Sequence, residues 1–425
     1  MPLLTIPPHF RRAWQDIAAA LLKWVTFGAL VGGLVGLAGS VFHLALEWAA
    51  EARAACPWLL FLLPVAGLAI VSSYQLTGMA DDPGTELVIT AIRSGARMRL
   101  RTAPLIFLAT FLTHLTGGSA GREGAALQLG GSISNALGQL LALEPEDEEV
   151  ITMCGIAAGF SALFGTPLTA AVFAMEVGCV GVMHYAALVP CLLASLLAQV
   201  VAGQLGVQPT RFTFTGMPAL DVEPMISILL LGILCGILAN LFCRAMQLGG
   251  ACGQKIGNPW LRAAAGGALV AVLSLLLGTG DYNGAGMDVI ARALDGSAVP
   301  AAFLLKMGLT ALTLGTGFKG GEIVPSLFVG ATFGCAAAPL LGLEASFGAA
   351  AAMVGVFCGV TNSPITSILL GYELFGGTGV TALALVAAVS YMTSGYHSLY
   401  HRQKIMYSKT KVKVVDAYSS GGTDE

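Results

Sequence analysis

The chain has 425 residues, of which 56% are apolar and only 11% are charged, whereas soluble domains carry roughly 25% charged residues. The formal net charge is −3, and long stretches such as 177–208 contain no Asp, Glu, Lys or Arg. This composition excludes an ordinary soluble α-protein, whose helices need polar outer faces at helical spacing. It predicts instead an all-α polytopic membrane protein with many apolar segments.

Apolar stretches follow one another along the chain, and many of them contain glycine or proline. They run at about 17–49, 57–76, 103–120, 125–143, 150–175, 177–206, 225–243, 263–280, 297–317, 323–343, 345–372 and 377–395. In lipid, irregular backbone is stable only where it is buried in protein or lines a polar cavity. With 55 glycines in the chain, the pattern predicts discontinuous helices and not a simple bundle.

Clusters of Lys and Arg lie between the apolar stretches, at 11–12, 93–101, 244–262 and 402–413. Loops rich in these residues stay on the cytoplasmic side. We therefore expect a multi-pass protein of the cell's inner (plasma) membrane with both termini in the cytoplasm.

The same spacing of proline and glutamate occurs in both halves of the chain. Pro167 is followed nine residues later by Glu176, and Pro364 is followed at the same spacing by Glu373. The equivalent positions of the two glutamates suggest a structural role, in which each carboxylate pairs with backbone N–H groups.

Glycine-bounded segments at 121–130 and 321–330 repeat at a similar offset of about 200 residues. Matching broken segments in two halves are typical of inverted-repeat transporters with a site near the membrane midplane. We expect one transmembrane domain with repeats at about 17–206 and 225–405. The last residues, 406–425, are interpreted as a short cytoplasmic tail without a regulatory domain.

The cluster Gly121-Arg122-Glu123-Gly124 carries the clearest functional chemistry in the sequence. Glycines let backbone N–H groups approach an ion without a side chain between them. A helix that begins there presents free N–H groups and its positive dipole end, which attract anions. Glu123 can occupy the anion position when ionised and leave it when protonated, and ionisable residues at membrane depth are usually functional.

This cluster matches the GREGP-type motif of the CLC family of chloride channels and proton-coupled anion exchangers. Two further segments resemble the same family, in order along the chain. They are Phe164-Gly165-Thr166-Pro167-Leu168 with Glu176, and Gly320-Gly321-Glu322-Ile323-Val324-Pro325 with Gly330-Ala331. The resemblance covers nearly the whole chain and implies an inverted-repeat fold, a homodimer and one anion pathway in each subunit.

By the same resemblance, Glu123 is the gating and proton-transfer glutamate, and Gly121, Arg122 and Gly124 beside it are expected to help bind the anion. The amides of Ile323 and Val324 are implied to bind the anion. Tyr400 stands where the family has the tyrosine that closes the inner side of the pathway.

The sequence also departs from the family pattern. The filter motif GSGIP is absent, and Thr85 is the candidate for its missing serine hydroxyl, with a turn or helix-cap role as the alternative. Val177 replaces the inner proton-transfer glutamate. Glu322 stands where most members have an apolar residue, and either donates a hydrogen bond to a small anion or caps the following helix. These departures resemble the bacterial fluoride/proton exchanger branch.

We therefore expect transport of fluoride or chloride in exchange for protons, with a passive chloride channel of the same fold as the alternative. An enzyme is not expected, because the six histidines form no HExxH motif. The nine cysteines show no paired spacing, so no metal or other cofactor is expected, nor a nucleic-acid partner. Lys306 and Lys319 are interpreted as lysines that reach the surface, with stabilisation of anion entry as the alternative.

Overall fold

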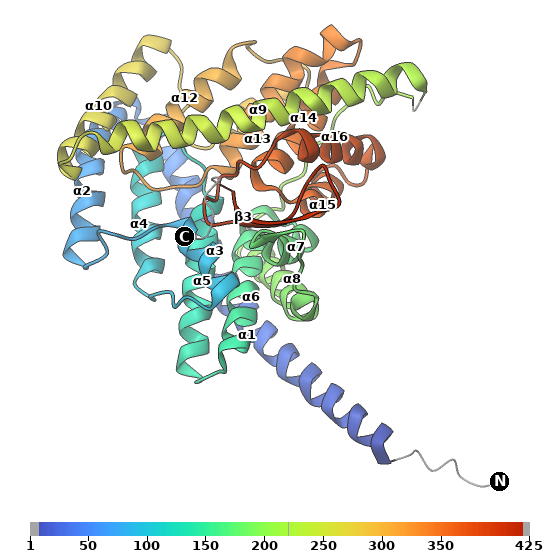
Figure 1. The fold of residues 1–425 in the computed structure, drawn as a ribbon. Coiled ribbons are helices and arrows are strands. Elements are labelled where there is room, and N and C mark those ends of the chain that lie inside the picture. Colours follow the sequence, from blue (N-terminus) through green and yellow to red (C-terminus); the bar gives the residue numbers. More distant parts are fainter. Residues whose placement is uncertain (1–7, 220, 420–425) are drawn as a thin grey trace.

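Helices account for most of residues 8–219 and 221–419, which are the residues that the computed structural model describes (Figure 1). The first half contains α1 (Pro8–Ala55), the 3₁₀ segment η1 (Pro57–Leu62), α2 (Leu63–Leu76), α3 (Thr85–Ser94), α4 (Thr102–Leu115), α5 (Glu123–Leu140), α6 (Pro145–Phe164), α7 (Pro167–Glu176), η2 (Tyr185–Ala187) and α8 (Leu188–Gln204). The second half contains α9 (Val222–Gln254), α10 (Pro259–Leu277), α11 (Met287–Leu294), α12 (Ala302–Gly315), α13 (Ile323–Ala337), η3 (Ala338–Leu341), α14 (Ala345–Thr361), α15 (Pro364–Leu374) and α16 (Val380–Thr393).

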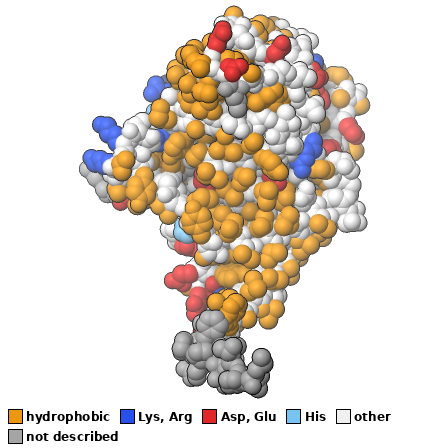
Figure 2. Space-filling view, turned by 90° about the vertical axis from the view of Figure 1, so that its right-hand side faces the viewer, with side chains coloured by type: hydrophobic (Ala, Val, Ile, Leu, Met, Phe, Trp, Pro, Cys, Tyr) orange, Lys and Arg blue, Asp and Glu red, His pale blue; other side chains and the backbone are white. Residues whose placement is uncertain are grey.

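The outer surface of the helices is apolar, as expected for a protein that spans a membrane. Among the described residues, six helical segments are long and apolar enough to cross a bilayer, and several shorter apolar helices accompany them. Large apolar side chains such as Leu276, Ile237 and Val65 are exposed. Figure 2 shows apolar side chains spread over one face of the molecule, with few charged groups among them.

The α-helices of the two halves correspond one to one, α1–α8 with α9–α16. For example, α4 and α12 each have 14 residues, and α5 packs on α6 as α13 packs on α14. Both α7 and α15 begin at a proline. The chain is therefore built from two inverted-topology repeats with discontinuous helices, as the sequence predicts.

Two long apolar runs, 150–175 and 345–372, are each divided into two helices at equivalent points. The first run breaks at Gly165, which adopts a left-handed φ of 66° and ends α6. The second breaks at Asn362, whose φ of 56° ends α14 in the same way. A proline follows each break by two residues and cannot continue the preceding helix.

Two short helices were missed by the sequence reasoning, because they lie in polar segments between the apolar stretches. They are α3 and α11, and each buries one apolar side while its other side stays polar. The apolar run 177–206 was also read too simply, since α8 begins only at Leu188.

A three-stranded sheet was not predicted either. Strand β1 (Cys179–Val180) pairs in parallel with β2 (Lys404–Tyr407), which pairs antiparallel with β3 (Val414–Tyr418). The segment expected to be a short tail thus folds against the helical body through Tyr418, whose ring lies under Arg93. The last expected tail residues, 420–425, lie outside the described residues.

Candidate functional site

The starts of α5 and α13 meet at a pair of glycines. The Gly121 N–H donates to the Gly321 carbonyl at 2.7 Å, and the Gly321 N–H donates to the Gly121 carbonyl at 2.8 Å. A Cβ atom on Gly321 would lie 2.5 Å from the Gly124 nitrogen, and one on Gly121 would lie 2.8 Å from Pro325 Cδ. Only glycine allows the two backbones to approach so closely, so the sequence brings two helix N-termini together.

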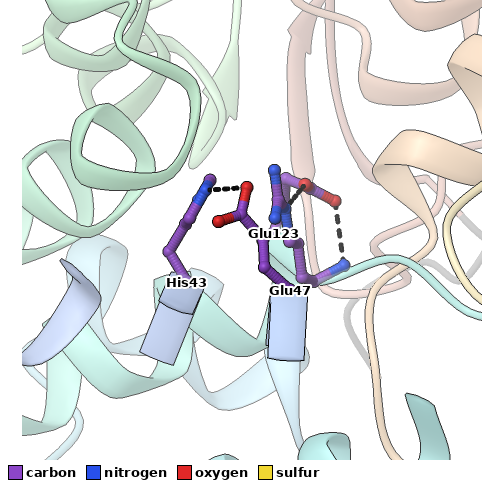
Figure 3. Close-up of polar contacts among 4 residues, drawn as sticks. His43, Glu47 and Glu123 are labelled. Atoms are coloured by element: carbon purple, nitrogen blue, oxygen red, sulfur yellow. Dashed lines mark hydrogen bonds and ion pairs between the residues drawn. The ribbon is translucent and has the colours of Figure 1, made fainter. Parts of the chain in front are cut away.

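Glu123 is the first residue of α5 and is fully buried. Its Oε2 atom accepts a hydrogen bond from the Arg122 backbone N–H at 3.0 Å, and its Oε1 atom lies 3.6 Å from Arg122 Nε. Oε1 has no hydrogen-bond partner among the described residues. The N–H of Val324 also faces this carboxylate, so the side chain lies over the start of α13. Figure 3 shows Glu123 together with the neighbouring His43–Glu47 pair.

The first turn of α13 supplies N–H groups at this crossing. Its first intrahelical hydrogen bond runs from the Ser326 N–H to the Glu322 carbonyl. The N–H groups of Ile323 and Val324 precede that bond, and both residues are buried. Such N–H groups, with the positive end of the helix dipole, form a site for an anion or a carboxylate.

Glu322 and Thr85 approach the same crossing near Gly124. A Cβ atom on Gly124 would lie 3.3 Å from Thr85 Oγ1 and 3.6 Å from Glu322 Oε2. Glu322 is the N-cap residue of α13, and its side chain makes no capping hydrogen bond to that helix. Thr85 begins α3, and its hydroxyl accepts a hydrogen bond from Gln128 Nε2 at 3.1 Å.

Tyr400 lies beside these groups with its hydroxyl buried and without a hydrogen-bond partner among the described residues. The hydroxyl is within electrostatic reach of Glu123 and Glu322. The backbone carbonyl of Tyr400 accepts a hydrogen bond from the hydroxyl of Ser419 at 2.6 Å. Ser419 directly follows β3, so the sheet helps to hold Tyr400 in place.

Glu86, which the sequence reasoning assigned no role, ties α3 to the Tyr400 segment. Its carboxylate accepts the backbone N–H groups of His401 at 2.6 Å and Arg402 at 2.9 Å. The only sequence signal for this contact is the position of Glu86 directly after Thr85, in the first turn of α3.

The structural role expected for Glu176 and Glu373 is confirmed, and it is reciprocal. Glu373 at the end of α15 accepts three hydrogen bonds at the start of α7, from Leu168 N–H, Thr169 N–H and the Thr169 hydroxyl. Glu176 at the end of α7 accepts the equivalent three at the start of α15. Each carboxylate therefore stabilises the N-terminus of the other repeat's helix.

The expectation that Lys306 reaches the surface is wrong. Its side chain is completely buried, and its ammonium group donates to the carbonyls of Tyr282 at 3.1 Å and Gly284 at 2.5 Å. It also lies 5.3 Å from the ring centre of Phe328. A buried cation needs such carbonyl and aromatic contacts to replace its water.

The family model for voltage gated chloride channels matches residues 66–395. The chain belongs to this family. A chloride/fluoride channel protein of Pseudomonas syringae pv. tomato is 38% identical over 409 residues, which cover 94% of this chain and 90% of that protein. The ClcB chloride channel of Escherichia coli O157:H7 is 26% identical over 416 residues, covering 92% and 94%.

Solved structures of the family superpose on most of the chain. The crystal structure of a CLC-type fluoride/proton antiporter matches with a TM-score of 0.86 and 31% identity, covering 91% of this chain and 98% of that one. A slow cyanobacterial Cl⁻/H⁺ antiporter matches with a TM-score of 0.75 and 20% identity, covering 88% and 94%. The chain is therefore a multi-pass membrane protein with the CLC fold, and the family's function is anion transport.

Proposed function

We propose that this protein exchanges a small halide anion, fluoride in preference to chloride, for protons, and that Glu123 is the gating and proton-transfer group. The observation that carries the proposal is the crossing of α5 and α13, where the Glu123 carboxylate lies over the first N–H groups of α13. A carboxylate in that place competes with an anion for the same donors. Protonation removes its charge, which frees the donors for the anion.

The anion in this proposal is held by the N–H groups of Ile323 and Val324, and it lies between Glu123 and Tyr400. Gly121 and Gly124 keep the space free of side chains, and the backbone N–H of Arg122 holds the carboxylate. None of these groups needs a metal ion or a catalytic nucleophile, so we propose transport and not an enzymatic reaction.

Fluoride is favoured by two polar side chains near the crossing. Glu322 Oε2 and Thr85 Oγ1 both approach Gly124, and a protonated Glu322 donates a hydrogen bond to an anion. Fluoride holds its water more strongly than chloride, so it needs stronger donors to replace that water. The named activities of the 38% identical relative and of the 31% identical antiporter agree with fluoride.

The test is anion flux from liposomes, with fluoride or chloride measured by electrode and pH recorded in the same trace. We expect uphill proton movement driven by a fluoride gradient, and loss of that movement in Glu123→Gln, which has no titratable group at the crossing. The control is Glu223→Gln, an exposed carboxylate at the start of α9. Proton movement retained in Glu123→Gln would contradict the role of Glu123. Flux of chloride without protons in the wild type would support the passive channel instead.

We further propose a homodimer in the inner (plasma) membrane with both termini in the cytoplasm. The carboxylates of Glu176 and Glu373 have their partners within one chain, so they do not bear on the dimer. Its support is the exposed apolar surface near η2, α8 and α15, with Tyr185 at 71% and Tyr372 at 48% exposure. Cross-linking in mild detergent should trap dimers, and monomers alone would contradict the assembly.

A further inference from the structure

An apolar groove of about 370 Å³ lies on the surface where α9, α10 and α12 meet. It runs beside the C-terminal part of α9, and its walls include Leu248, Cys252, Leu269, Gly308 and Leu312. None of the residues that line the groove carries a charge. The groove is therefore suited to an apolar ligand and not to an ion.

Small residues at the contacts between these helices create the groove. A Cβ atom on Gly253 of α9 would lie 2.0 Å from the carbonyl oxygen of Gly315 at the end of α12. A Cβ atom on Gly266 of α10 would lie 2.1 Å from Thr316 Oγ1. Small residues let membrane helices approach this closely. Beside these contacts Gly308 leaves open space, because a Cβ atom there would have no other atom within 4 Å.

The groove faces the lipid that surrounds the protein. Its walls are open to the outside, since Leu248 is 64% exposed and Leu269 is 48% exposed. Helices α10 and α12 lie away from α8 and α15, whose exposed surface supports the proposed dimer (Figure 1). A second copy bound at that surface therefore leaves the groove uncovered, and the surrounding acyl chains are as apolar as its walls.

An arginine without a partner lies at one end of the groove. A Cβ atom on Gly253 would lie 3.6 Å from Arg262 Cδ, so the stem of Arg262 borders the groove. Its Nε atom is buried and has no hydrogen-bond partner among the described residues, and the guanidinium forms no ion pair with a carboxylate there. Buried polar groups are nearly always satisfied, so this nitrogen indicates an acceptor from a ligand.

The same end of the groove has the residues of a membrane interface. Lys255 directly follows α9 and is exposed, and Trp260 at the start of α10 is 41% exposed. Tryptophan gathers at the bilayer interface, and basic pockets between membrane helices bind the head groups of anionic lipids. Asp81 borders a separate recess with Arg262 and Lys319, but it is exposed and forms no ion pair with either in the described part of the chain.

We propose that this groove binds an anionic phospholipid, with one acyl chain between α9, α10 and α12 and the phosphate at Arg262 and Lys255. The acyl chain fills the open space at Gly308. The phosphate oxygens accept hydrogen bonds from the guanidinium, which suits the planar fork of arginine. This site is separate from the crossing of α5 and α13, and it does not depend on which ion the protein transports.

The test is a titration of delipidated protein in detergent with dioleoylphosphatidylglycerol, in which native mass spectrometry counts the bound lipid. We expect the wild type to retain a single tightly held lipid per subunit. Gly308→Leu places a side chain in the open space of the groove. Its affinity for the lipid should fall roughly tenfold or more, because buried methylene groups of the acyl chain lose their place.

Two further variants test the head group and the specificity. Arg262→Gln removes a charged hydrogen-bond donor, so we expect a roughly tenfold loss of affinity. Gly33→Leu is the matched control, because Gly33 lies in α1, outside the groove, and a Cβ atom there also has no other atom within 4 Å. Its affinity should equal that of the wild type. Size-exclusion chromatography checks that each variant is folded, and glycerol 3-phosphate, which lacks the acyl chains, should not displace the lipid.

The other outcomes would overturn the proposal. Wild-type protein that retains no lipid, or equal affinities in the wild type and Gly308→Leu, would exclude the groove as the site. An equal loss in Gly33→Leu would show that binding does not depend on the groove. A loss in Gly308→Leu with unchanged affinity in Arg262→Gln would refute the phosphate contact. A polypeptide that stays bound to the wild type and is lost in Gly308→Leu would assign the groove to a membrane helix instead.

Discussion

The reciprocal contacts of Glu176 and Glu373 allow a stability prediction of defined size. In each contact the carboxylate accepts two N–H groups at 3.1 and 2.8 Å and one hydroxyl at 2.6 Å. Both glutamates are less than 9% exposed, so little solvent screens them. A glutamine in the same place keeps one acceptor oxygen but turns an NH₂ group toward a backbone N–H.

The Glu373→Gln change therefore loses one charge-assisted hydrogen bond, at about 1.5–3 kcal/mol, and weakens the remaining two. We expect a loss of about 2–4 kcal/mol in the free energy of unfolding. Because the distances in the two contacts are equal, Glu176→Gln should cost the same within about 0.5 kcal/mol.

The measurement is thermal or denaturant unfolding in one detergent, followed by tryptophan fluorescence. The control is Glu146→Gln, an exposed carboxylate that makes no hydrogen bond or ion pair in the described part of the chain, for which we expect a change below about 0.5 kcal/mol. A loss below 1 kcal/mol for both buried glutamates, or clearly different losses for the two, would refute the reciprocal contact.

Two further predictions concern the site and the C-terminal hairpin. If Glu322 donates a hydrogen bond to the anion, Glu322→Gln should retain part of the fluoride flux. Glu322→Ala should lose roughly ten- to hundredfold in apparent affinity for fluoride. Equal fluoride-to-chloride flux ratios in the wild type and both variants would contradict this prediction. Lys409, between β2 and β3 and outside the membrane-spanning helices, has its pKa lowered from 10.5 to about 8 by burial. Between these pH values the unfolded tail binds a proton that the docked tail has released, so docking should strengthen as pH rises from about 8 to 10.5. The measurement is the rate of chymotrypsin cleavage of the hairpin, expressed as the ratio of wild type to Lys409→Met at pH 7.5 and at pH 9.5. This ratio should be lower at pH 9.5, and an unchanged ratio would contradict the prediction.

The sequence predicted the parts of the fold that depend on local pattern. The apolar stretches located most membrane helices, and Pro167 and Pro364 marked two helix starts, because proline fits the first turn and not the interior. The motif around Glu123 placed a helix N-terminus at the residue where α5 begins. These features follow from a few neighbouring residues.

Contacts between distant segments were beyond the sequence reasoning. The structural role of Glu373 was predicted, but not that Glu373 and Glu176 each bind the helix N-terminus of the other repeat. The spacing within one half of the chain does not indicate which helix end lies next to the carboxylate. Lys306 was misread because a lysine in an apolar stretch has the same sequence signature whether it reaches the surface or meets carbonyls inside. The contact of Glu86 with the Tyr400 segment spans more than 300 residues.

The paired hydrogen bonds of Gly121 and Gly321 limit how the protein can move during a transport cycle. They join the two repeats at the centre of the proposed pathway, and separating the repeats there would leave four buried backbone groups unpaired. Rocking one half against the other, as in transporters whose site lies at a loose interface between repeats, would have to break this link. Exchange of the two ions is therefore expected to rely on rotation of side chains such as Glu123 and Tyr400 within a nearly fixed backbone. A disulfide or cross-link between the repeats placed away from these side chains should leave the turnover rate almost unchanged.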